Sequence, residues 1–151
     1  GAIAYRIINT LDSMIGYTDS YHYHLGWMAA KLDTISNYVP ARICAILLVI
    51  SSKLVGGDWR NSMLIMRKDH NNTPSLNGGY PMSALAGALK VKLEKVGYYK
   101  LGTSIEPLSI EKCKSALTIV KLSIILFFVF ISIPIVLLLS IFGWWNFLYV
   151  F

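Results

Sequence analysis

The C-terminal end of the chain restricts the fold most, because the last thirty residues, 122–151, carry no charged side chain. Leu122 to Phe142 is an apolar run of twenty-one residues. As a helix it would be about 31 Å long, which matches a bilayer core of roughly 30 Å. Pro134 lies inside the run, and we expect a kink there without a break, because neighbouring groups can satisfy the freed carbonyl. The far membrane interface favours amphipathic rings, and three follow the run: Trp144, Trp145 and Tyr149.

The composition supports a membrane class. Apolar and aromatic residues make up 55% of the chain and charged residues 15%, with a mean hydropathy of +0.54, whereas soluble domains are about a quarter charged. The run is too long, and at the wrong end, for a signal peptide. We therefore expect an all-α integral membrane protein in the cell membrane, a few apolar helices in the lipid bilayer joined by polar loops that carry motifs. Residues 1–115 would hold amphipathic and intramembrane helices, and residues 116–151 a C-terminal transmembrane helix.

The formal net charge of +6 is unevenly distributed. Residues 1–40 contain two basic and three acidic side chains, whereas residues 41–151 contain twelve and five. Between Lys90 and Lys121 there are seven lysines and three glutamates, which by the positive-inside rule places this segment in the cytoplasm and the C-terminus outside. No nucleic-acid-reading motif accompanies the lysines, so nucleic acid is not an expected partner. The two cysteines have no disulfide or zinc spacing and are expected to be reduced: Cys44 and Cys113.

Apolar periodicity predicts the helices. Residues 1–15 form an amphipathic helix that Gly16 ends. The following stretch is expected to be a polar loop with a short helix, until Pro40 begins a second apolar helix that stops at Gly56 and Gly57. That helix has about seventeen residues, roughly 25 Å, which is marginal for spanning. We expect it to be re-entrant, steeply tilted or interfacial, because a spanning helix would separate the polar motifs before and after it. The remainder is expected to form a polar segment, a helix and a basic connector, over residues 57–81, 82–96 and 97–114.

The first predicted helix carries a polar stripe. Its members are three or four residues apart, so they share a face and can converge on a polar ligand: Arg6, Asn9, Thr10 and Ser13, with Asp12 beside them. A solvated helix face is the competing interpretation. Polar groups near a membrane are costly and often functional, which keeps the stripe as a candidate site.

The segment PSLNGGYPMS is a second candidate. Its glycines, Gly78 and Gly79, let the backbone approach a ligand, and N–H groups at a helix start suit phosphate. It is not a G-x-x-x-x-G-K-[ST] loop, and a plain turn is an equally good interpretation. His22 and His24 share a face only on a strand and have no third ligand nearby, so they do not indicate a metal site. His70 beside Asp69 fits a proton carrier or a surface pair equally well.

Three ordered segments within residues 1–102 resemble the adenosylcobinamide-phosphate synthase family of membrane proteins in cobalamin (vitamin B12) biosynthesis. Tyr5 to Tyr17 matches Y-R-x-x-N-T-L-D-S-M-x-G-Y throughout. A second motif, G-W-x-x-A-x-L-D followed by N-x-x-P-A-R, is matched at Gly26, Trp27, Ala30, Leu32, Asp33, Asn37, Pro40, Ala41 and Arg42. A third, S-P-N-A-G-W-P-E, is matched at Ser75, Asn77, Gly79 and Pro81 but not at Leu76, Gly78, Tyr80 and Met82. The change at Met82 removes a carboxylate, which either marks an archaeal-type branch or weakens a catalytic role for this loop.

The resemblance implies an acid–amine ligase that joins adenosylcobyric acid to aminopropanol or its phosphate, with ATP and Mg²⁺. We expect four residues of the first motif to be catalytic: Asn9, Thr10, Asp12 and Ser13. We expect the corrinoid and amine substrates to contact Arg6, Tyr17, Trp27, Asp33, Arg42, Ser75, Asn77, Gly78 and Gly79, whereas no metal ligand is identified. If Asn9 to Ser13 and Asn77 to Gly79 serve one reaction, they must meet on one side of the bilayer, near the cytoplasmic surface.

The resemblance also bears on what this chain can do alone. An acidic family motif would lie before Gly1, so the chain is expected to be the downstream part of a longer protein and inactive without it. An upstream segment of the same protein, or another enzyme of the pathway, is therefore an expected partner. A shortened, non-catalytic membrane scaffold or corrinoid-binding subunit is the alternative. A transporter is weaker, because two apolar helices are few for a midplane site.

Overall fold

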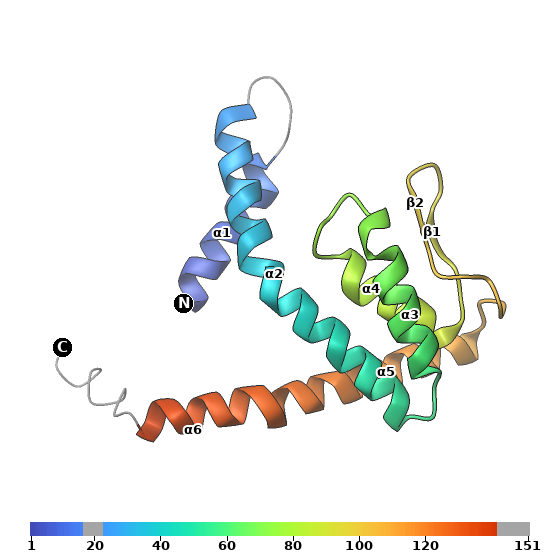
Figure 1. The fold of residues 1–151 in the computed structure, drawn as a ribbon. Coiled ribbons are helices and arrows are strands. Elements are labelled where there is room, and N and C mark those ends of the chain that lie inside the picture. The colour runs from blue at the N-terminus through green and yellow to red at the C-terminus, as the bar shows by residue number, and fades with distance from the viewer. Residues whose placement is uncertain (17–22, 142–151) are drawn as a thin grey trace.

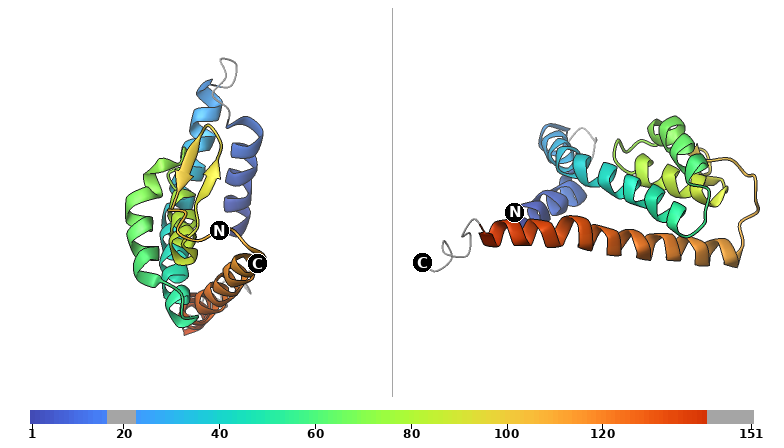
Figure 2. Two further views of the ribbon diagram at one scale, coloured as in Figure 1. Left: turned by 90° about the vertical axis from the view of Figure 1, so that its right-hand side faces the viewer. Right: turned by 60° about the horizontal axis from the view of Figure 1, so that its bottom comes forward.

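The computed structural model describes residues 1–16 and 23–141. Most of these residues are helical, and α1 lies along the N-terminal half of α2 while α3, α4 and a β-hairpin gather beside its C-terminal half (Figures 1 and 2). The elements in chain order are α1 (Ala2–Ile15), α2 (Tyr23–Leu54), α3 (Trp59–Asp69), a 3₁₀ turn (His70–Asn72), α4 (Gly79–Leu89), β1 (Leu93–Lys95), β2 (Tyr99–Leu101), α5 (Ile110–Phe127), a π-helical segment (Phe128–Ser132) and α6 (Ile133–Ile141).

The first predicted helix is confirmed. It ends at Ile15, where the N–H of Gly16 donates to the Asp12 carbonyl at 2.8 Å. No residue of α1 is fully buried. The helix therefore lies on the surface of α2 and does not belong to the hydrophobic core.

The prediction that Pro40 begins a helix was wrong, because Pro40 lies inside α2, which is helical from Tyr23 to Leu54. Proline removes one N–H and crowds the preceding turn, at a cost of about 3 kcal/mol. Contacts of α2 with α1, α4 and α5 offset that cost. The 32 residues of α2 make a helix of about 48 Å, so the length argument against spanning does not apply. The predicted stop is confirmed, since Gly56 has a positive φ of 80° just after α2.

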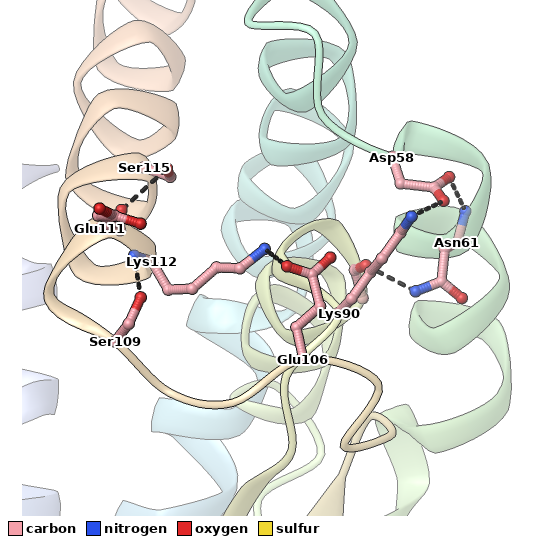
Figure 3. Close-up of polar contacts among 9 residues, drawn as sticks. Asp58, Asn61, Lys90, Glu106, Ser109, Glu111, Lys112 and Ser115 are labelled. Carbon is pink, nitrogen blue, oxygen red and sulfur yellow. Dashed lines mark hydrogen bonds and ion pairs between the residues drawn. The ribbon is translucent and has the colours of Figure 1, made fainter.

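The segment 57–81, predicted to be polar and without a helix, contains α3. Asp58 begins this helix by accepting a hydrogen bond from the Asn61 N–H at 3.0 Å (Figure 3). Ile65 and Met66 are buried against the rest of the molecule. A cap and a short apolar face thus make a helix out of a segment whose average composition is polar.

The predicted helix over 82–96 was wrong beyond Leu89, because Lys90 takes the left-handed conformation with φ of 58°. The chain then forms an antiparallel hairpin in which Leu93 faces Leu101, with Gly97 at φ of 78° in its turn. This hairpin is the exception to the predicted all-α class. Two anchors hold it: Leu101 is fully buried, and the Gly102 N–H donates to Asp69 Oδ2 at 2.8 Å.

The predicted C-terminal helix is confirmed as far as Ile141, but it begins at Ile110, inside the segment predicted to be a connector. The Ser109 hydroxyl caps it by accepting from the Lys112 N–H at 3.3 Å (Figure 3). The helix continues through Pro134 without a break, and the π-helical segment ends at Ser132, two residues before that proline. π turns are a common response where the i→i−4 ladder is interrupted. The aromatic residues Trp144, Trp145 and Tyr149 lie outside the described residues.

The hydrophobic core lies between α2, α3, α4 and α5. Its buried members are Ala45, Leu48, Val49, Met66, Ala84, Ala88, Leu89, Val91 and Ile119. Among the described residues, two helices are long and apolar enough to cross a membrane, Gly26–Leu54 and Ile110–Ile141. The most apolar part of the second has no buried residue.

Candidate functional site

The site is built on one polar face of α2. Asn37 lies one helical turn after Asp33, and its Nδ2 donates both to Asp33 Oδ1 at 2.9 Å and to the Asp33 carbonyl at 3.1 Å. Both side chains are half-buried. The spacing of four residues lets the two side chains meet on the helix surface.

Residues of α1 bind the same face. The Tyr5 hydroxyl donates to Asn37 Oδ1 at 2.7 Å, and Asn9 Nδ2 is 3.5 Å from Asp33 Oδ1. Tyr5 and Asn9 are also one turn apart, so two adjacent turns of α1 match two adjacent turns of α2. The first and second sequence motifs are thus joined by side-chain hydrogen bonds.

Asn77 brings the third motif to the next position on α2. It is buried, and its Nδ2 donates to the Thr34 carbonyl at 2.9 Å. Its Oδ1 accepts from Arg42 Nη1, while Arg42 Nη2 is 3.4 Å from the Leu76 carbonyl. Asn9 and Asn77 therefore contact consecutive residues of one helix, although they are far apart in the sequence.

Arg42 lies between two aromatic rings. Its guanidinium carbon is 3.7 Å from the Tyr38 ring centroid and 4.2 Å from that of Tyr80, whose ring in turn lies 4.3 Å from the His70 ring. The Arg42 Nε is buried without a hydrogen-bond partner. Within residues 1–16 and 23–141, every hydrogen-bond acceptor of Arg42 is a neutral oxygen. The site thus holds a positive charge whose surroundings are aromatic and amide groups.

A cleft of about 520 Å³ opens between α2 and the segment that precedes α4. It is lined by Asp33, Thr34, Asn37, Pro40, Ala41, Cys44, Pro74, Ser75, Leu76, Asn77, Gly78 and Pro81. A smaller apolar pocket of about 280 Å³ shares Pro40 and Cys44 with it and reaches Phe127 of α5. The polar cleft and the apolar pocket meet at α2, an arrangement that suits an amphipathic molecule.

Asp12 lies near this hydrogen-bonded group on α1. Burial raises the pKa of its carboxyl, and the negative charge of Asp33 raises it further. Repulsion between two carboxylates disfavours ionisation of both, and a protonated carboxyl or a nearby cation relieves it.

The structure divides the residues predicted for α1 between two faces. Asn9 and Asp12 are half-buried, whereas three others are exposed: Arg6, Thr10 and Ser13. Ser13 Oγ donates to the Thr10 carbonyl at 2.8 Å, a contact within the same helix. Their proposed roles remain predictions, as do those of Trp27, which is 59% exposed beneath Lys31, and Tyr17, which lies outside the described residues.

Ser75 and Gly78 of the third motif line the cleft, whereas Gly79 does not. The Gly78 N–H donates to Ser75 Oγ at 3.1 Å, so this N–H already has a partner. A Cβ at Gly79 would lie 1.9 Å from the His70 carbonyl oxygen, so only glycine fits there. Close approach of two backbone segments accounts for Gly79 without a ligand.

Several residues that contact the site were not predicted from sequence: Tyr5, Thr34 and Asn37, and the aromatic neighbours of Arg42, Tyr38 and Tyr80. Asn37 follows Asp33 by four residues and Tyr5 precedes Asn9 by four, so helical spacing could have found both. Thr34 contributes only its carbonyl oxygen, which no side-chain pattern can indicate. In the part of the chain that the structure describes, no three His, Cys, Asp or Glu side chains are grouped to hold a metal ion.

Comparison with known proteins identifies the family of this chain. The family described as CobD/Cbib protein matches residues 1–126. A probable cobalamin biosynthesis protein CobD of Methanothermobacter thermautotrophicus is 47% identical over 127 residues, which are 84% of this chain and 43% of that protein. The namesake in Methanocaldococcus jannaschii is 43% identical over 129 residues, 85% of this chain and 41% of that protein.

A bacterial relative is similar as well. The cobalamin biosynthesis protein CobD of Dehalococcoides mccartyi is 42% identical over 125 residues, 80% of this chain and 39% of that protein. The chain thus spans about two fifths of the length of these relatives. No solved structure matches it. Because the family match covers most of the chain and includes all three motifs, the chain belongs to the CobD/Cbib family.

Proposed function

We propose that this chain is a membrane-embedded part of a cobalamin-biosynthesis enzyme that forms an amide bond between adenosylcobyric acid and aminopropanol or its phosphate. Family membership supports the role in cobalamin biosynthesis. The observation that carries the assignment of the site is the convergence of three motifs on residues 33–42 of α2. Since the chain spans about two fifths of its relatives, the activity is proposed for the whole protein, of which this cleft forms one wall.

Amide formation from a carboxylate needs activation, because a carboxylate is a poor electrophile. ATP would supply that activation, after which the amine attacks the acyl carbon, the activating group leaves and the nitrogen loses a proton. The protein must therefore bind anionic groups and place the amine. Arg42, whose hydrogen-bond acceptors among the described residues are all neutral, would supply the positive charge for an anionic group.

Asp12 and Asp33 suit the cation that accompanies a nucleotide. Mg²⁺ keeps several waters and is usually held by one or two carboxylates together with substrate phosphates, so a pair is sufficient. Burial, and after it the negative charge of Asp33, raises the pKa of Asp12, and a bound cation would relieve the repulsion between the two carboxylates. Asn9 and Asn37 would keep Asp33 in place through their amide groups.

The Asp12→Asn variant tests this proposal in the whole protein. The substitution keeps the shape of the side chain and removes one negative charge, so turnover should fall about a hundredfold or more, as when other positioned electrostatic groups are lost. Turnover is measured as the amine-dependent formation of the amide product. Glu111→Gln is the matched control, because it removes a carboxylate on exposed α5 and should leave turnover unchanged. Normal turnover by Asp12→Asn would remove Asp12 from the site.

The membrane location is part of the proposal and rests on the two candidate spans. The protein should stay with the membrane fraction during carbonate extraction, and release into the soluble fraction would contradict this. For orientation, cysteines are introduced at Lys100 and Tyr149 after the exposed native thiols, Cys44 and Cys113, have been replaced. Lys100→Cys should be labelled from the cytoplasmic side and Tyr149→Cys from the other, and labelling from one side alone would refute the orientation.

A corrinoid-binding scaffold without catalysis is the second candidate. It is favoured by the cleft and the adjoining apolar pocket on α2, which suit an amphipathic ligand whether or not chemistry follows its binding. Under this alternative, Asp12→Asn would leave corrinoid binding unchanged and no variant of this chain would alter turnover. Measuring corrinoid binding and product formation on the same variants separates the two functions.

A further inference from the structure

Helix α3 has two distinct faces. The inward face is closely packed against α4: Ser62 and Ile65 are buried, and the Ser62 hydroxyl donates to the Ala84 carbonyl at 2.7 Å. Met66 and Asp69 continue the buried side toward the end of the helix. This face needs no further partner.

The outward face of α3 combines apolar and cationic side chains. Two neighbouring rows of side chains line a shallow groove of about 580 Å³, and within each row the residues are four apart in the sequence. One row contains Trp59, Met63 and Arg67, and the other contains Arg60, Leu64 and Lys68. Leu64 is 58% exposed and Trp59 37%. An apolar surface that is regularly interrupted by cations is typical of a helix that lies in a membrane interface.

No carboxylate of α3 compensates this charge. At the start of the helix the Asp58 carboxylate forms an ion pair with Lys90 at 3.2 Å and accepts a hydrogen bond from the Asn61 N–H (Figure 3). At its end Asp69 accepts from the Gly102 N–H. Among the residues that the structure describes, no ion pair involves the cations of this surface, which are Lys53, Arg60, Arg67 and Lys68.

The position of α3 in the chain adds an independent argument. It begins five residues after Leu54, the last residue of a candidate membrane span. Lys53 at the end of that span lies 5.2 Å from the Trp59 ring centroid, and Arg60 lies 5.5 Å from it. Tryptophan and basic residues at the end of a membrane span are typical of the lipid headgroup region.

We propose that the outward face of α3, with Lys53, binds the anionic headgroups of membrane lipids. The inference rests on the proposed membrane location but not on the proposed reaction. Its four cations match phosphate-bearing headgroups, and Trp59, Met63 and Leu64 suit the boundary between headgroups and acyl chains.

The test uses the 151-residue chain in lipid nanodiscs, with Trp59 as its single tryptophan after Phe substitution of the other three. Lipids brominated near the headgroup end of the acyl chain quench tryptophan on contact. Brominated phosphatidylglycerol, mixed as a minor component into unbrominated phosphatidylcholine, should quench Trp59 several-fold more than the same amount of brominated phosphatidylcholine. This excess should fall as the salt concentration rises.

Charge variants of the same chain identify the source of the excess. Combined Arg60→Gln, Arg67→Gln and Lys68→Gln should abolish it, because each basic residue near an anionic surface strengthens the attraction roughly fivefold. The matched control, Lys95→Gln with Lys100→Gln and Lys114→Gln, removes the same charge from exposed positions elsewhere and should preserve it. Circular dichroism verifies that both variants retain their helices.

Three outcomes would overturn the inference. Equal quenching by both lipids would show contact without charge recognition. No quenching by either would place this face against protein or water. If the control variant also lost the excess quenching by brominated phosphatidylglycerol, the excess would come from the net charge of the chain and not from this surface. Failure of the chain to enter nanodiscs at all would instead contradict the proposed membrane location, so the two failures are distinguishable.

Discussion

The region around α3 and α4 and the long helix formed by α5 and α6 are both rich in apolar residues but use them differently. In the first, Ile65, Ala84 and Leu89 are buried against neighbouring elements. In the second, only Ile119 and Ser123 are buried, whereas Phe128 is 62% exposed and most of the other large apolar residues are exposed. The first region buries its hydrophobic residues in tertiary contacts, whereas the second requires an apolar environment from outside the chain.

The two regions also differ in how closely their backbones approach. α3 and α4 make the most extensive helix contact in the molecule, and Gly87 lies where they cross. Asn61 Nδ2 donates to the Gly87 carbonyl at 2.7 Å across this contact. α6 has no such neighbour in the described part of the chain. Substitutions of similar size should therefore have very different effects in the two regions.

Gly87→Val should have the largest effect. A Cβ at this position would lie 2.7 Å from the Asn61 carbonyl oxygen and 2.8 Å from the Ser62 Cα, both backbone atoms. We expect a loss of about 4 kcal/mol or more, the range of severe backbone and overpacking clashes. Hydrogen exchange of the α3 and α4 amides in detergent measures the change.

Ser140→Val is the control for Gly87→Val, because it places the same side chain on exposed α6. It should leave hydrogen exchange in α3 and α4 unchanged. If Gly87→Val were tolerated as well, the close contact between α3 and α4 would not be the source of stability in this region.

Ile65→Ala should have the next largest effect, because Ile65 is only 2% exposed. Removing a buried aliphatic side chain costs about 2–4 kcal/mol through lost transfer free energy and the cavity left behind. Leu137→Ala, at a position that is 58% exposed, should change the free energy of unfolding in detergent by less than about 0.5 kcal/mol. Equal losses for both would mean that α6 has a protein partner in solution.

Asp58→Ala should have the smallest effect and the clearest pH dependence. The Asn61 main-chain N–H, followed by the Lys90 ion pair, lowers the pKa of the Asp58 carboxyl below its ordinary value. Losing this helix cap should cost about 1 kcal/mol at neutral pH. A lowered folded-state pKa stabilises the fold above the unfolded-state value of about 3.9, and this contribution is lost as the pH falls through the folded-state pKa.

The measurement for Asp58 is the difference in the free energy of unfolding between the natural chain and Asp58→Ala, followed from neutral pH to about pH 3. The difference should shrink on acidification, because a protonated Asp58 no longer binds Lys90 as an ion pair. Glu111→Gln, on the exposed start of α5, serves as the reference. A difference that stays constant with pH would show that Asp58 acts through its shape and not through its charge.

Much of the candidate site could be predicted from the spacing of residues in the sequence motifs. The three motifs name Asn9, Asp33, Asn77 and Arg42, which the structure connects through α2. Spacing could not show which residues of the polar stripe on α1 face α2 and which face outward, because Asn9 and Thr10 are adjacent and both polar. Only the position of α2 shows that Asn9 faces a partner while Thr10 faces outward.

The sequence by itself determined the elements whose cause is local. A charge-free apolar run makes a helix through Pro134 regardless of its neighbours, and Gly16 ends an amphipathic segment. Tertiary structure decided the continuity of α2 through Pro40 and the end of α4 at Lys90. At Pro40 the packing of α2 against α1, α4 and α5 outweighs the helix-breaking preference of proline, and at Lys90 the burial of Leu101 outweighs the helical preference of the segment. Both sets of contacts join residues that are distant in the chain.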